Sequence, residues 1–265
     1  MVIDSHEHIF SNIKSQIELM DKAGVEKTIL FSTTFHPENA RNLLEIESEM
    51  NKLTKILSGE LKGEERLLRQ KQSNEEVSEA VRNNPNRFMG FGAVPLDLNQ
   101  NDTSEWINKY IVNSNLLGAG EFTPGNIDAV INLEKVFKAL SDNPKYPMWI
   151  HTFDPVNLEK LKVIMNMCTK YPRVKVILGH LGGVNWRSVI EFAKDKPQIY
   201  LDLSAVYSTF QIKSAVWQVP ERCLFSSDAP MNEPSIYRFM LEKTIDDKSI
   251  LKGVLGENIQ KALEL

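Results

Sequence analysis

The feature that most restricts the fold of this chain is a regular alternation of apolar, strand-like segments with helix-like segments. The pattern predicts eight short strands, each separated from the next by residues with helical spacing or by turn residues. The strand candidates are 2–3, 25–32, 87–94, 116–120, 146–150, 174–179, 198–203 and 223–227. Alternation of this kind predicts parallel strands that are joined by helical crossovers.

The length of the chain restricts how these strands are arranged. At 265 residues the chain is close to the size of a (β/α)8 TIM barrel, which typically needs about 250 residues. We therefore expect one α/β domain, residues 1–265, with a closed barrel and an active site at the carboxyl ends of the strands. An open doubly wound sheet is the rival fold. Closure favours a shared site, because it makes the first and eighth strands neighbours.

Residues 38–72 are longer and more charged than an ordinary barrel crossover. Their composition predicts helix, and we interpret them as a helical insertion after the second strand, followed by a separate helix at 75–83. Loops at this end of a barrel often carry function, so a lid or a dimer contact is one interpretation. A solvated, charged surface is the other.

Composition and charge favour some classes of protein over others. An apolar content of 42% suits a globular protein, and a net charge of −4 argues against a general nucleic-acid-binding surface. The two cysteines, Cys168 and Cys223, are typical core residues of a protein in a reducing compartment. The sequence has no apolar run of the ~20 residues that a membrane span needs and no signal-peptide pattern. We expect a cytoplasmic protein with a small-molecule substrate and without nucleic-acid or membrane partners. The sequence is also compatible with a homo-oligomer.

Histidines cluster at the predicted ends of strands. His6 and His8 follow the first strand, and residues at i and i+2 of an extended backbone point to the same side, so both imidazoles can reach one metal ion. A histidine pair alone is a weak signal. His151 and His180 also come directly after strands, however, and Asp228 follows the eighth strand. In a closed barrel these five side chains converge.

Glu121 stands at the end of the fourth strand, after Gly118-Ala119-Gly120. The two glycines allow close backbone approach at this point. The position of the carboxylate matches that of the histidines, so Glu121 is a sixth candidate for the same cluster. The simpler interpretation is a carboxylate that pairs with a nearby basic side chain.

Other residues after strand ends are candidates for contact with a substrate. An apolar pocket could be lined by five aromatic side chains, Phe35, Phe122, Phe153, Trp186 and Tyr207, although loop packing is the simpler interpretation for each. Arg187 could pair with a substrate carboxylate or be solvated at the surface. His36 lies in the loop after the second strand, and its position fits either a substrate contact or a surface residue.

Several segments together resemble one family. Asp4-Ser5-His6-Glu7-His8 is similar to the opening His-x-His motif of the amidohydrolase superfamily. Together with 150–151, 178–183, 225–230 and 256–258, it resembles the amidohydrolase-related branch, which includes the metal-dependent aminocarboxymuconate semialdehyde decarboxylase type and small lactone hydrolases. The resemblance covers the whole chain. It implies the barrel fold and a metal site, and it says little about the substrate.

The resemblance also implies roles for the residues at the strand ends. It implies metal ligation by three histidines: His6, His8 and His151. His180 would bind a second ion or act as a catalytic base, and Asp228 would be a ligand or an acid–base group. The fourth strand end has no lysine, so the carboxylated lysine of many binuclear relatives is not expected. Glu121 stands there instead, which resembles the TatD-like hydrolases, where a glutamate bridges two ions.

These residue types support a definite chemistry. Imidazole and carboxylate ligands suit Zn²⁺ best, with Mn²⁺, Fe²⁺ or Ni²⁺ also compatible, as one ion or two. Such an ion lowers the pKa of bound water from about 15.7 to about 7. Asp228 can then take up a proton and pass it to the leaving group, and His180 can stabilise an oxyanion or act as a second base. We therefore predict a metal-dependent hydrolase of a small ester, lactone or amide.

Three other functions stay open at this stage. A metal-dependent decarboxylase of a small unsaturated or aromatic carboxylic acid would use the same ion, and basic residues near the site would favour it. A phosphodiesterase or nuclease of the TatD kind is supported only by Glu121. The third is a catalytically silent barrel, which has no physical need for an intact set of ligands.

Overall fold

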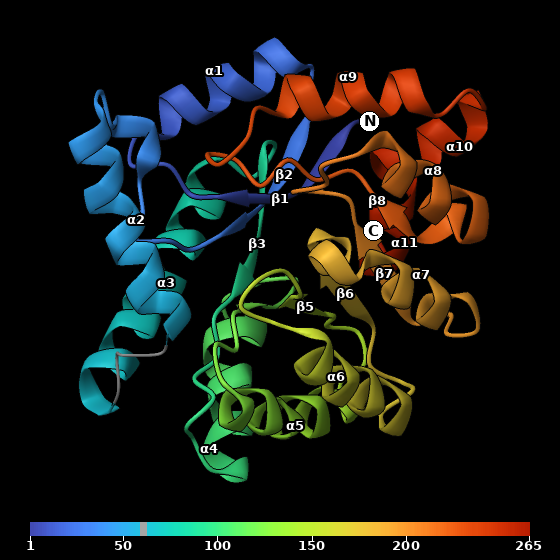
Figure 1. Cartoon of the computed structure of the whole chain (residues 1–265). Helices are drawn as coiled ribbons and strands as arrows, with labels where there is room; N and C mark the ends of the chain where they lie inside the picture. The colour runs from blue at the N-terminus through green and yellow to red at the C-terminus, as the bar shows by residue number, and fades with distance from the viewer. Residues whose placement is uncertain (59–62) are drawn as a thin grey trace.

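The computed structural model describes the backbone of residues 1–58 and 63–265 and the side chains of 1–55 and 63–265. Eight parallel strands form one sheet in the order of the sequence, and helices surround it (Figure 1). The strands are β1 (Ile3–His8), β2 (Lys27–Phe31), β3 (Phe88–Gly92), β4 (Gly118–Phe122), β5 (Met148–His151), β6 (Val176–Gly179), β7 (Ile199–Asp202) and β8 (Cys223–Leu224).

The sheet closes because β8 and the residues after it lie beside β1. Ser5 donates its backbone N–H to the carbonyl of Phe225 at 2.9 Å, and Asp228 donates to the carbonyl of His6 at 2.9 Å. The predicted (β/α)8 TIM barrel is therefore confirmed, and the open doubly wound sheet is wrong. Closure brings the polar residues at the end of β1 and those that follow β8 to the same rim of the barrel.

The helices follow local signals in the sequence. α1 (Ile13–Ala23) begins where the Asn12 side chain accepts the backbone N–H groups of Lys14 and Ser15, and it ends at Gly24, whose φ is 65°. The helices after β3 are α4 (Gln100–Ile107), α5 (Ile127–Ser141), α6 (Leu158–Lys170), α7 (Trp186–Lys194), α8 (Thr209–Gln218), α9 (Pro234–Thr244), α10 (Lys248–Lys252) and α11 (Asn258–Leu263). Among the described residues, none of the helices is long and apolar enough to cross a membrane.

Two helices lie between β2 and β3, on one side of the barrel: α2 (Leu43–Ser58) and α3 (Gly63–Asn83) (Figure 1). α3 is continuous across residues 72–75, which corrects both the predicted end of the insertion at 72 and the predicted separate helix at 75–83. Asn74 is a weak helix former, but its side chain exchanges two hydrogen bonds with the backbone of Ala93, at 3.0 and 2.7 Å. This tertiary contact offsets the low helix propensity of Asn74. Residues 59–62 of the predicted insertion lie outside the described residues.

The interior of the barrel is packed with large apolar side chains. Phe31, Phe91 and Trp149 are fully buried there, and residues of α11 join the same cluster. The ring of Trp149 lies 4.2 Å from the ring of His6, so the apolar interior reaches directly to the polar rim. A second and larger core fills the space between the barrel and its helices.

Candidate metal centre and substrate cavity

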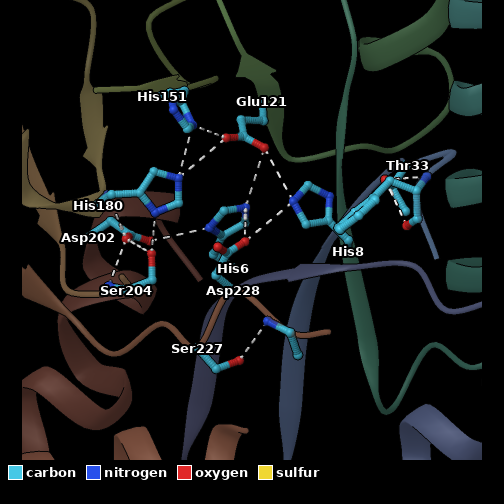
Figure 2. A network of polar contacts seen from close by, with 12 residues as sticks. His6, His8, Thr33, Glu121, His151, His180, Asp202, Ser204, Ser227 and Asp228 are labelled. Carbon is cyan, nitrogen blue, oxygen red and sulfur yellow. Dashed lines mark hydrogen bonds and ion pairs between the residues drawn. The ribbon is translucent and has the colours of Figure 1, made fainter. Parts of the chain in front are cut away.

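The carboxyl ends of five strands bring six polar side chains around one point at the rim of the barrel (Figure 2). We call them the rim cluster: His6, His8, Glu121, His151, His180 and Asp228. None of these side chains is more than 15% exposed. All six candidates from the sequence therefore meet in one place.

Glu121 stands between two pairs of histidines. Its Oε2 atom lies 3.4 Å from Nε2 of His8 and 3.7 Å from Nε2 of His6. Its Oε1 atom lies 2.9 Å from Nδ1 of His151 and 3.6 Å from Nε2 of His180 (Figure 2). The two oxygens of one carboxylate thus face two lobes of the rim cluster.

Asp228 belongs to the lobe formed by the first two histidines. Its Oδ1 atom lies 3.5 Å from Nε2 of His8 and 3.8 Å from Nε2 of His6. The backbone of Asp228 has a φ of 62°, in the left-handed region that non-glycine residues adopt mainly where function or packing requires it. Asp228 also lines the cavity described below, so its carboxylate can meet a substrate.

The outer ring nitrogens of two histidines bond to backbone carbonyls. Nε2 of His151 lies 2.9 Å from the carbonyl oxygen of Asp154, and Nδ1 of His8 lies 3.4 Å from that of Ser32. A carbonyl oxygen only accepts, so these ring nitrogens carry the proton, and in a neutral imidazole the other nitrogen presents a lone pair to the centre. Proteins orient metal-binding histidines in this way.

Ring nitrogens and a carboxylate oxygen face one another at the centre. Nδ1 of His151 and Nε2 of His180 lie 3.1 Å apart, and both face Oε1 of Glu121. Two ring nitrogens and a buried carboxylate oxygen stay this close only if a proton or a cation lies between them. In addition, neither ring nitrogen of the fully buried His6 has a hydrogen-bond partner among the described residues. This set of nitrogen and oxygen donors fits a divalent cation.

The carboxylates give the rim cluster a negative potential. Burial alone would lower the pKa of His6, but Glu121, Asp228 and Asp202 outweigh it and raise this pKa to about 9. Burial alone would raise the pKa of Glu121, but hydrogen bonds from the surrounding histidines hold it well below its usual value. The site is therefore built to hold positive charge, either as protons or as a cation.

A cavity of about 740 Å³ extends from the rim cluster to α3. Its wall includes three aromatic side chains: Phe35, Phe122 and Phe153. α3 contributes two half-buried arginines, Arg66 and Arg69. Asp97 and Asp128 line the same cavity, yet neither arginine forms an ion pair within the described part of the chain. The cavity thus offers two guanidinium groups that are free to bind an anion.

Of the substrate contacts predicted from the sequence, the structure places three in the wall of this cavity. They are Phe35, Phe122 and Phe153, whereas His36, Trp186, Arg187 and Tyr207 do not line it. Arg187 is exposed in the first turn of α7, with its guanidinium 5.8 Å from the ring of Trp186. The ring of His36 bonds to the carboxylate two residues later at 3.0 Å. Tyr207 is 64% exposed. These residues follow strand ends, but the loops and helices that begin there carry them away from the rim.

Four residues that lie beside the site were not predicted from the sequence. Asp202 ends β7, and Ser204 follows it with Oγ 2.8 Å from Nδ1 of His180. A signal for these two existed, because they stand at a strand end like the members of the rim cluster. Arg66 and Arg69 carried no such signal, since charged residues on a helix are usually solvated.

Fold and site together define a class of protein. A closed parallel barrel whose histidines and carboxylates converge at the carboxyl ends of the strands has the arrangement of barrel enzymes, which place their active sites there. The sequence profile of the amidohydrolase family matches residues 3–265. This chain therefore belongs to the amidohydrolase family, whose members are metal-dependent enzymes. No curated protein matched the sequence.

Solved structures share the fold. The 5-carboxyvanillate decarboxylase of Sphingomonas paucimobilis has a TM-score of 0.71 and 14% identity, and the match covers 100% of this chain and 99% of that one. A dihydroxybenzoic acid decarboxylase from Polaromonas sp. JS666, with bound manganese and the inhibitor 2-nitroresorcinol, has a TM-score of 0.70 and 16% identity over 100% and 97%. The 4-oxalomesaconate hydratase of Rhodopseudomonas palustris has a TM-score of 0.68 and 12% identity over 100% and 96%.

Proposed function

We propose that this protein is a metal-dependent decarboxylase of a small unsaturated or aromatic carboxylic acid. The observation that carries the proposal is a pair of arginines in the wall of the cavity that reaches the rim cluster. Arg66 and Arg69 have no ion-pair partner among the residues that the structure describes. A decarboxylase binds a carboxylate in every turnover, whereas a hydrolase of a neutral ester does not. Guanidinium groups bind carboxylates through charge-assisted hydrogen bonds, often two at once. The manganese-containing decarboxylase of the same fold is consistent with this function.

In this proposal the rim cluster holds one or two divalent ions, Zn²⁺ or Mn²⁺. Its six members would be the ligands: His6, His8, Glu121, His151, His180 and Asp228. Glu121 would bridge two ions in the TatD-like manner, which its two oxygens support because they face different lobes. A bound divalent ion supplies a Lewis acid that stabilises negative charge on substrate oxygens.

The protein's own groups perform the other parts of the reaction. Arg66 and Arg69 bind the acid, and Phe153 packs against its apolar part. In decarboxylation the bond from carbon to the carboxylate breaks, carbon dioxide leaves, and the electron pair that stays on the carbon takes up one proton. Asp228 lines the cavity beside His8, where its carboxylate can take up a proton from solvent and pass it to that carbon.

Hydrolysis of a small ester, lactone or amide is the second candidate, and the charge of Asp228 favours it. Burial would raise the pKa of Asp228, but hydrogen bonding from His8 and the charges of the neighbouring histidines lower it. The group therefore stays a carboxylate, which can accept a proton from an attacking water and pass it to the leaving group.

The two reactions differ in what happens to water. Purified protein loaded with Zn²⁺ or Mn²⁺ is incubated in ¹⁸O-labelled water with unsaturated and aromatic acids, and separately with esters, lactones and amides. We expect carbon dioxide release from an acid and an organic product without labelled oxygen. Incorporation of one labelled oxygen into the product, with no carbon dioxide formed from any acid, would overturn the first candidate in favour of the second.

Substitution of the arginines tests the observation behind the proposal. Arg66→Ala and Arg69→Ala are each expected to raise the KM for the acid about 10- to 100-fold, because a hydrogen bond to a charged group contributes about 1.5–3 kcal/mol. Arg187→Ala is the matched control, since that arginine is exposed on α7 and does not line the cavity. An unchanged KM in both cavity variants would remove the argument for a carboxylate substrate.

A further inference from the structure

Asp202 and Ser204 form a short hydrogen-bonded chain behind His180 (Figure 2). The hydroxyl of Ser204 donates to Oδ1 of Asp202 and lies 2.8 Å from Nδ1 of His180. Asp202 and Ser204 are fully buried, and His180 is 4% exposed. Water is therefore not available to replace any of these contacts.

The protons available on these groups fix the direction of the hydrogen bonds between them. The carboxylate of Asp202 has no proton to donate, and the hydroxyl of Ser204 has only one, which it gives to Asp202. Ser204 must then accept at its oxygen from His180, so the proton of a neutral imidazole is on Nδ1. The lone pair of His180 is consequently on Nε2, the atom that lies 3.6 Å from Glu121.

The same carboxylate also holds the backbone at His180. Oδ1 of Asp202 accepts the N–H of His180 at 3.0 Å and the N–H of Ser204 at 3.0 Å. The backbone φ values of His180 and Leu181 are 58° and 51°, in a region that L-residues with side chains occupy at a cost. Asp202 thus supports a strained turn and, through Ser204, the orientation of its ring.

We infer that Asp202 and Ser204 are positioning residues, which fix His180 with the Nε2 lone pair directed at the rim cluster. The inference rests on the proposed metal centre, but not on the reaction or the substrate. Ser204 is expected to matter through the ring of His180, because its side chain does not line the cavity.

NMR spectroscopy tests the position of the proton directly. The full-length protein is labelled with ¹⁵N-histidine and loaded with Zn²⁺, and the resonances of His180 are assigned with the variant His180→Gln. We expect a ring proton bonded to Nδ1 of His180 and none bonded to Nε2. A proton on Nε2, alone or together with one on Nδ1, would overturn the inference whatever reaction the enzyme catalyses.

Metal affinity provides a second measurement that does not depend on activity. Ser204→Ala is expected to weaken Zn²⁺ binding about 10- to 100-fold in a competition titration, as loss of a hydrogen-bond partner behind a ligand typically does. Ser226→Ala is the matched control, because Ser226 is equally buried after β8 but its hydroxyl has no partner among the described residues. Equal affinities of the two variants, with both folded by circular dichroism, would show that Ser204 does not position His180.

Discussion

The contact between Gly179 and Trp149 lies directly below the rim cluster, and substitutions at these two positions test how the interior of the barrel supports that cluster. Gly179 ends β6, and a Cβ atom added there would overlap Cη2, Cζ2 and Cζ3 of the Trp149 indole on β5. The φ of Gly179 is −67°, so alanine meets no backbone strain and the overlap alone decides the result. The indole in turn packs 4.2 Å from the ring of His6 and 5.2 Å from that of His180. A displaced indole therefore disturbs both the packing of the barrel interior and the positions of His6 and His180 in the rim cluster.

The expected magnitudes follow from this overlap. Gly179→Ala is expected to lower the free energy of unfolding by about 1–3 kcal/mol, the usual cost of overpacking a core. Trp149→Phe alone is expected to cost about 1–2 kcal/mol, because it removes part of a ring whose complete truncation costs about 3–5 kcal/mol. It loses no hydrogen bond, since Nε1 of Trp149 has no partner among the described residues.

The double variant distinguishes a steric clash from independent effects. The smaller phenyl ring leaves room for the new methyl group, so the double variant should be about as stable as Trp149→Phe alone. The coupling free energy is then about 1–3 kcal/mol in favour of the double variant. Urea unfolding of the four proteins, without added metal and compared at equal m-values, measures it. Additivity within about 0.5 kcal/mol would refute the proposed overlap.

Two further predictions concern the metal and the end of the chain. Removal of metal with a chelator should abolish turnover. Readdition of Zn²⁺ or Mn²⁺ at 100 times its Kd should restore turnover and raise the free energy of unfolding by about 2.7 kcal/mol. Full turnover of metal-free protein would contradict the metal-dependent function. The Asn258 amide donates to the carbonyls of Pro220 and Cys223, both at 2.8 Å. Asn258→Ala leaves both carbonyls unpaired and should therefore lower the free energy of unfolding in urea by about 2–4 kcal/mol. A loss below about 0.5 kcal/mol would contradict this reasoning.

Local patterns in the sequence predicted the fold and the location of the rim-cluster residues at the strand ends. An apolar run ends where a strand leaves the barrel wall, so the polar residue that follows it lies at the rim. His151, His180 and Glu121 were found by this rule, without knowledge of any contact between them. The rule is weaker for helices. Asn74 looks like a place where a helix can break, but its hydrogen bonds to Ala93, far along the chain, offset its low helix propensity within α3.

Local patterns along the chain predict the barrel and the residues at the strand ends, because the periodicity of apolar side chains indicates both the type of an element and the face it buries. The arginines that reach the cavity and the groups that stand behind the histidines are instead set by long-range packing. Arg187 follows a strand and still points away from the site, whereas Arg66 and Arg69 lie on a helix after β2 and line the cavity. Contacts of this kind depend on how α3 packs beside β3 and on which strand ends meet when the sheet closes, and neither is encoded in the spacing of residues along the chain.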